Sequence, residues 1–129
     1  MIKIVVALFM LSSILFALEW EKDLDTALKT AQKEHKNIMV MVESTHCRWC
    51  KKMKNRTLSD ETIEKRLKQF VLVKVMKSDG NAMAKLPPVK GVPTIFFMKE
   101  DKEILEDVVG YFNVLDFNSY IDDVEKMLK

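Results

Sequence analysis

The sequence predicts an α/β domain with a mixed central sheet of about four strands and helices on both faces. Two observations predict it: a helix-strand-helix-strand order in the first part of the chain, and two closely spaced strands followed by a helix at the end. Strands joined through a helix pair in parallel with a right-handed crossover, whereas strands joined by a short turn pair antiparallel. The chain has 129 residues, which suits one domain, since compact domains usually hold roughly 100 to 150 residues.

The amino-terminal segment differs from the rest of the chain. Lys3 precedes an apolar run over residues 4–11, and small residues that suit cleavage follow up to Ala17. The apolar stretch is shorter than the roughly 20 residues that a membrane-spanning helix needs. We expect residues 1–17 to be a secretory signal peptide and residues 18–129 to be the mature domain, with an uncleaved membrane anchor as the alternative. Export to the periplasm or a similar oxidising compartment favours thiol chemistry.

The first half of the mature chain alternates between helical and strand patterns. Apolar side chains at helical spacing indicate a first helix over residues 20–31, starting at Trp20. The apolar, partly β-branched residues 38–42 predict a buried strand. Residues 48–54 are expected to be helical, and Ser59 or Asp60 is expected to cap a further helix.

The second half supplies the remaining strands and the last helix. Phe70–Met76 is the second predicted strand, and Thr94–Met98 and Ile104–Val109 are the third and fourth. The charged turn at residues 99–102 makes the last two an antiparallel hairpin. Apolar residues over 114–128 recur every three or four positions and predict an amphipathic final helix.

Composition supports a folded core and argues against nucleic-acid binding. Apolar residues make up 48% of the chain, and the 21 basic residues are nearly balanced by 19 acidic ones, for a net charge of +2. Such a balance gives no strong attraction toward a polyanion. Seven strand residues should lie in the core: Val40, Val42, Leu72, Val73, Ile95, Phe96 and Phe97.

The two cysteines, Cys47 and Cys50, follow a predicted strand and open a predicted helix. At a helix amino terminus the unpaired backbone N–H groups and the helix dipole favour a thiolate. We therefore expect Cys47 to be the nucleophile that forms a mixed disulfide, and the more buried Cys50 to resolve it. Arg48 and the lysines that follow add positive charge that also favours the thiolate. The alternative is a thiol pair or an inert disulfide without turnover.

These residues resemble the thioredoxin superfamily, and most closely its exported single-domain members. The Cys-Arg-Trp-Cys motif at 47–50 is similar to the family's active-site pair, and Gly-Val-Pro-Thr at 91–94 is similar to its second hallmark. The resemblance covers nearly the whole mature chain and implies a thioredoxin-like fold. It also implies a cis peptide bond before Pro93, facing the cysteines, and a backbone at Val92 that pairs with a substrate strand.

Three residues around the cysteines depart from the family pattern. His46 stands where thioredoxins usually carry tryptophan, and Arg48 and Trp49 replace the usual Gly-Pro. A protonated His46 would stabilise the Cys47 thiolate, whereas an exposed loop histidine would have no effect. Because residues beside and inside the motif influence its redox behaviour, we expect all three to tune the site.

A fourth departure leaves the proton acceptor for Cys50 open. Met41 stands where the family usually has a buried aspartate. Side chains two residues apart on a strand point to the same face, so Glu43 shares the face of Met41 and is the candidate carboxylate beneath Cys50. The alternative is a solvated charge at the end of the strand.

The resemblance implies a thiol:disulfide oxidoreductase, and the absence of an inserted helical domain argues against the large periplasmic oxidants of this superfamily. A small exported disulfide reductase is our first interpretation. Its substrates would be oxidised or wrongly paired cysteines of other exported proteins, a membrane partner would supply electrons, and the protein would be a monomer without a cofactor or resident metal.

Two alternatives use the same cysteines without catalytic turnover. One is a binding module that keeps the fold, and the other is a copper or zinc site formed by Cys47, Cys50 and His46, since thiolates and imidazole suit soft ions. Haem attachment is disfavoured, because Lys51 occupies the histidine position of the Cys-x-x-Cys-His signal.

Overall fold

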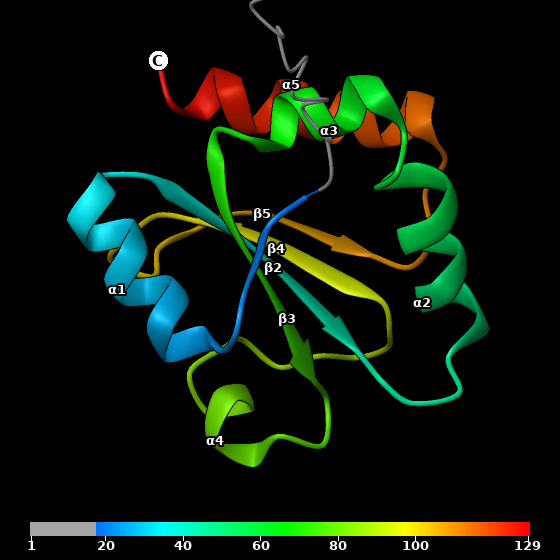
Figure 1. Ribbon diagram of the computed structural model, residues 1–129, viewed down its shortest axis with the longest axis horizontal. Helices are drawn as coiled ribbons and strands as arrows, with labels where there is room; N and C mark the ends of the chain where they lie inside the picture. The colour runs from blue at the N-terminus through cyan, green and yellow to red at the C-terminus, as the bar shows by residue number, and fades with distance from the viewer. Residues whose placement is uncertain (1–17) are drawn as a thin grey trace, which may run out of the picture.

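A five-stranded mixed sheet carries helices on both of its faces (Figure 1). The structure is a computed structural model that describes residues 18–129. The predicted fold class is confirmed, with one strand more than expected. The strands are β1 (Trp20–Glu21), β2 (Asn37–Glu43), β3 (Phe70–Met76), β4 (Thr94–Met98) and β5 (Ile104–Val109), in the sheet order β1-β3-β2-β4-β5. The helices are α1 (Leu24–Glu34), α2 (Arg48–Lys52), the π-helix η1 (Met53–Thr57), α3 (Glu61–Leu67), α4 (Gly80–Met83) and α5 (Val114–Met127).

Strand pairing follows the lengths of the connections. The long helical crossover through α2, η1 and α3 makes β2 and β3 parallel, and Val40 lies opposite Val73. The short turn after β4 makes β4 and β5 an antiparallel hairpin, and β4 also pairs antiparallel with β2. The parallel pairing of β2 with β3 and the β4–β5 hairpin were predicted from the connection lengths, whereas the pairing of β4 with β2 was not.

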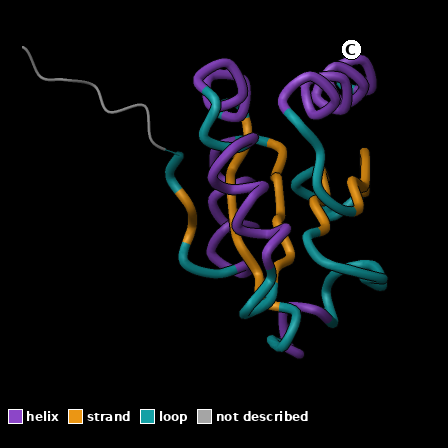
Figure 2. Tube along the Cα trace, turned by 90° about the vertical axis from the view of Figure 1, so that its right-hand side faces the viewer, coloured by secondary structure: helices purple, strands orange, loops and turns teal. Residues whose placement is uncertain are grey.

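The sheet separates two hydrophobic clusters because side chains alternate between its faces. On one face, β2 to β4 pack against α2, α3 and α5; on the other, they pack against α1 and α4. Figure 2 shows the same layers after a quarter turn, with α5, marked by the carboxy terminus, seen nearly end-on. All seven predicted core residues are at most 4% exposed: Val40, Val42, Leu72, Val73, Ile95, Phe96 and Phe97.

The first predicted helix starts too early. Trp20 lies in the short strand β1, which pairs in parallel with β3, and this strand is the one that the sequence pattern missed. The helix begins at Leu24 because Asp23 caps it, accepting a hydrogen bond from the backbone N–H of Thr26 at 2.7 Å. Trp20 and Leu24 are four residues apart, a spacing typical of one helix, although they belong to two elements.

The segment after the cysteines contains more elements than predicted. The expected helix over residues 48–54 divides into α2 and the π-helix η1, and Asp60, rather than Ser59, caps α3. The one-turn helix α4, capped by Asp79, was not predicted at all.

The predicted signal peptide at residues 1–17 lies outside the described residues. Among residues 18–129, no helix is long and apolar enough to cross a membrane.

Candidate redox site

The two cysteines form a disulfide at the start of α2. Cys47 is the N-cap residue of that helix, directly after β2 and its turn, and Cys50 lies in the first turn. Their Cα atoms are 5.2 Å apart, within the usual range for a disulfide. Cys47 is partly exposed, whereas Cys50 is only 1% exposed. An incoming sulfur atom therefore reaches Cys47 and not Cys50.

The backbone around Cys47 is suited to a negatively charged sulfur. The backbone N–H of Cys50 donates a hydrogen bond to the Sγ atom of Cys47 at 3.1 Å. This N–H is one of the donors that a helix leaves unpaired at its amino terminus. After reduction, the same donor and the helix dipole would stabilise a Cys47 thiolate.

The three predicted tuning residues lie at the surface around the disulfide. His46 is exposed and has a positive φ of 60°, so it forms the turn that leads into α2. Arg48 is exposed, and Trp49 is 50% exposed. The Trp49 ring packs against Tyr111, with ring centroids 5.8 Å apart. The tuning effect of these residues stays a prediction.

Glu43 is buried at the end of β2. It is 8% exposed, so it is not the solvated charge that was the alternative. Its Oε1 atom accepts a hydrogen bond from Nζ of Lys54, on η1, at 2.6 Å. Met39 and Met41, which share its strand face, belong to the same core cluster as Cys50. Glu43 therefore contacts the segment that directly follows the helix of the cysteines, and its role as proton acceptor for Cys50 stays a prediction.

The loop before β4 brings the second motif to the same cluster. Val92 and Cys47 both pack as partly buried residues against that cluster. The Val92–Pro93 peptide bond is cis. The carbonyl of Pro93 accepts a hydrogen bond from Gly110, whose φ of +98° favours glycine, at 2.8 Å.

Sequence reasoning expected the lysines after Arg48 to add positive charge, but it did not predict the contacts that Lys54, Lys52 and Tyr111 make with the site residues. Lys54 pairs with Glu43, and Lys52 places its ammonium group 4.8 Å from the ring centroids of both Trp49 and Tyr111. The three-residue step from Trp49 to Lys52 is a signal for contact on a helix. No comparable signal connects Tyr111, which follows β5, to a residue more than 60 positions earlier.

The described residues show no ready-made metal site. Within residues 18–129, no group of three or more His, Cys, Asp or Glu side chains is arranged to hold a metal ion. Cys47 and Cys50 are bonded to each other.

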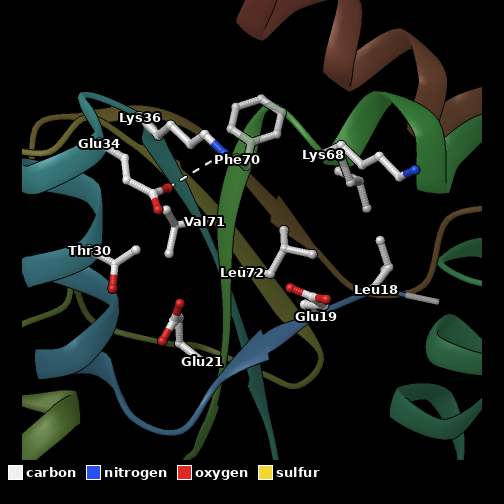
Figure 3. A pocket seen from close by; sticks show the side chains of 11 residues that line it. Leu18, Glu19, Glu21, Thr30, Glu34, Lys36, Lys68, Phe70, Val71 and Leu72 are labelled. Carbon is white, nitrogen blue, oxygen red and sulfur yellow. Dashed lines mark ion pairs between the residues drawn. The ribbon is translucent and has the colours of Figure 1, made fainter. Parts of the chain in front are cut away.

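A pocket of about 440 Å³ lies apart from the cysteines, beside β1 and the start of β3 (Figure 3). Lys36 and Glu34 form an ion pair at its rim, with a 3.5 Å separation. Figure 3 shows Glu19, Glu21 and Thr30 along its lower part and Phe70 at its top. Neither cysteine lines this pocket, so the redox site is separate from it.

The thioredoxin-like class of thiol:disulfide oxidoreductases is defined by a mixed β-sheet with helices on both faces and a Cys-x-x-Cys pair. In this chain, the second strand leads into the helix that the Cys-x-x-Cys disulfide opens. The chain belongs to the thioredoxin-like domain family, whose model matches residues 24–125. No curated protein sequence matches the chain.

Solved structures share the fold. A thioredoxin from Thermus thermophilus is 24% identical, with a TM-score of 0.70 over 83% of this chain and 86% of that one. The oxidised DsbD C-terminal domain of Neisseria meningitidis is 23% identical, with a TM-score of 0.64 over 82% and 97%. The periplasmic thioredoxin SoxS of Paracoccus pantotrophus is 14% identical, with a TM-score of 0.61 over 73% and 100%. At these identities the similarities show a shared fold only, and the family itself is shown by the model that matches residues 24–125.

Proposed function

We propose that the protein is an exported disulfide reductase that acts on cysteines of other exported proteins. One observation carries the proposal: the Cys47–Cys50 disulfide opens α2 with one sulfur accessible and the other buried. A structural disulfide gains nothing from an accessible sulfur at a helix amino terminus. A nucleophile needs both the access and the stabilised thiolate.

The reaction is two successive thiol–disulfide exchanges. The Cys47 thiolate attacks one sulfur of a substrate disulfide, forming a mixed disulfide and releasing the other substrate sulfur as a thiolate. Cys50 then loses its proton and attacks Sγ of Cys47, which releases the second substrate thiolate and forms the Cys47–Cys50 disulfide. Two electrons pass to the substrate, so a dithiol partner must supply two electrons to reduce the Cys47–Cys50 disulfide again. A membrane protein would be that donor.

Several observations support export and the substrate geometry. The apolar run near the amino terminus has the length of a signal peptide core, and a periplasmic thioredoxin shares the fold. Val92 borders the same cluster as Cys47, where its backbone would pair with an extended substrate segment. The protein would act as a monomer.

Trapping of the mixed disulfide tests the assigned roles. Cys50→Ser leaves Cys47 able to attack but removes the resolving thiol, so this variant should accumulate covalent adducts with insulin or with exported proteins. Cys47→Ser should form none and should reduce no insulin, and non-reducing gel electrophoresis followed by mass spectrometry would show both results. Adducts formed by Cys47→Ser and not by Cys50→Ser would reverse the roles. If insulin in excess dithiothreitol is reduced no faster with the wild-type protein than without it, the proposed enzyme activity is contradicted.

A further inference from the structure

An open hollow of about 360 Å³ lies beside the disulfide and is lined by Arg48, Trp49, Lys52, Asn55 and Arg56. We call these five residues the basic-aromatic surface. We propose that this surface binds an acidic segment of the substrate next to its target cysteine, and so selects acidic proteins for reduction. The inference rests on the proposed reductase function and names the substrates of that same site.

The cations of this surface form no ion pair with the described part of the chain. The stretch from Arg48 to Arg56 carries five cations and no carboxylate. Lys54 is neutralised by the buried Glu43, and within residues 18–129 the other four, Arg48, Lys51, Lys52 and Arg56, form no ion pair. The whole chain has a net charge of only +2, so this excess is local. A concentration of cations at a binding site attracts carboxylates and speeds their encounter.

The aromatic part of the surface is held in place. Trp49 is half exposed, and its ring packs on Tyr111 while the Lys52 ammonium group lies 4.8 Å from both ring centroids. Cation–π and aromatic contacts of this kind restrict the side chain before a substrate arrives. A rigid apolar surface flanked by charge binds a peptide at a lower entropic cost than mobile side chains do.

The size of the surface sets the length of the substrate segment. From Arg48, between the two cysteines, to Arg56 is eight helical residues, or about 12 Å. An extended chain covers that distance with about four residues, at roughly 3.3 Å each. A substrate cysteine bonded to Cys47 would therefore place about four flanking residues over the basic-aromatic surface, and carboxylates among them would meet Lys52 and Arg56.

Competition between peptide disulfides tests this inference. Three synthetic peptides with the same disulfide carry four flanking glutamate, serine or lysine residues, and their rates of reduction by the pre-reduced protein are compared. Because both rates are measured with the same protein, the ratio of the glutamate-peptide rate to the serine-peptide rate cancels any change in the reactivity of Cys47. We expect a ratio of about tenfold at low salt, which decreases as salt screens the charges. Lys52→Gln/Arg56→Gln should bring the ratio to about two or below, and Lys52→Glu/Arg56→Glu should favour the lysine peptide.

The matched control removes the same charge elsewhere. Lys29 and Lys33 are exposed on α1, across the sheet from the cysteines (Figure 1), so Lys29→Gln/Lys33→Gln should keep the wild-type ratio. A wild-type ratio near one would overturn the inference. An equal fall of the ratio in Lys52→Gln/Arg56→Gln and in Lys29→Gln/Lys33→Gln would overturn it as well. In either case, reduction of the serine peptide would still uphold the enzyme. Failure to reduce any peptide would overturn both.

Discussion

At the residue scale, the different burial of the two sulfur atoms supports the proposed roles of Cys47 as nucleophile and Cys50 as resolving thiol. Cys47 accepts the backbone hydrogen bond of Cys50 and is partly exposed, whereas Cys50 is closed off by the core. Cys50 must nevertheless lose a proton in a buried place before it can attack. Glu43 is the buried carboxylate on the strand face that this helix covers.

Glu43→Gln therefore should slow resolution of the mixed disulfide by at least about tenfold, because a positioned general base contributes at least that much. The amide oxygen of Gln still accepts a hydrogen bond from Lys54, so stability should change by about 1 kcal/mol or less. Stopped-flow measurement of substrate release against pH checks this, since the pH profile of the step should lose the contribution of the carboxylate.

Glu61→Gln is the control for this variant. Glu61 forms an ion pair with Lys65 on the same helix, α3, with 3.4 Å between Oε1 and Nζ, and both side chains are exposed. Its loss should leave the resolving step unchanged. If Glu43→Gln also keeps the wild-type rate and pH profile, Glu43 is a structural partner of Lys54 only.

Strand alternation was enough to place Glu43 on the correct face of the sheet, but not to find its partner. Lys54 is eleven positions further on, in the π-helical turn at Met53–Thr57, so no regular strand or helix spacing connects it to Glu43. The phase of such a turn is set by tertiary packing, here including the Thr57 hydroxyl, which donates to the carbonyl of Phe112 at 2.6 Å.

At the element scale, α3 and α5 are joined by charged and polar side chains. Nη2 of Arg66 lies 2.7 Å from Oδ1 of Asp122 and 3.0 Å from Oε2 of Glu125. The side-chain amide of Gln69 donates to Glu125 at 2.9 Å. The hydrogen bond from Gln69, followed by the contacts with Arg66, holds the pKa of Glu125 below its ordinary value of 4.5.

This lowered pKa predicts a pH dependence of stability. A carboxyl group with a lower pKa in the folded state stabilises the fold above its unfolded pKa, and the contribution is lost as the pH falls through the folded pKa. Glu125→Gln should therefore be less stable than the wild type at about pH 6, and the difference should shrink toward zero at about pH 3. Urea denaturation at both pH values measures it, and a difference that stays constant with pH would contradict the ion-pair explanation.

The elements themselves were predicted unevenly, for physical reasons. Strands β2 to β5 and helix α5 have long apolar patterns, so their positions followed from the sequence. Strand β1 has two residues, and its pairing with β3 depends on tertiary contact. Trp20 happened to continue the helical spacing of α1, and the Asp23 cap shows where the helix starts.

At the scale of the whole molecule, aromatic packing attaches α5 to the sheet. Phe117 is fully buried against Phe97, with ring centroids 6.1 Å apart, and Phe97 in turn packs on Phe70. Phe117→Ala should lower the free energy of unfolding by about 3–5 kcal/mol, since it removes apolar contact and leaves a cavity. That is a large share of the roughly 5–15 kcal/mol that stabilise a typical domain.

Leu115→Ala is the matched control. It makes a similar truncation on the same helix, but Leu115 is 77% exposed, so the change should be within about 0.5 kcal/mol. Urea unfolding curves compare the two variants. Equal losses would show that α5 does not depend on this packing.

The fold class could be predicted because the two motifs fall where the apolar patterns place the end of one strand and the start of another. The pair at Cys47 and Cys50 and the loop at Pro93 are distant in sequence, and the sheet order brings their elements β2 and β4 together. The contacts of Tyr111 with Trp49 and Lys52 could not be predicted. They depend on how the end of β5 lies against α2, which no local pattern specifies.

The reduction potential of the Cys47–Cys50 pair tests the proposed reductase most directly. It is measured by equilibrating the protein with glutathione or dithiothreitol buffers and quantifying the reduced fraction. A reductase should have a potential more negative than about −200 mV, toward the roughly −270 mV of thioredoxin, and each 30 mV corresponds to about 1.4 kcal/mol. A potential near −120 mV, typical of a strong periplasmic oxidant, would contradict the reductase and assign the opposite direction of electron flow.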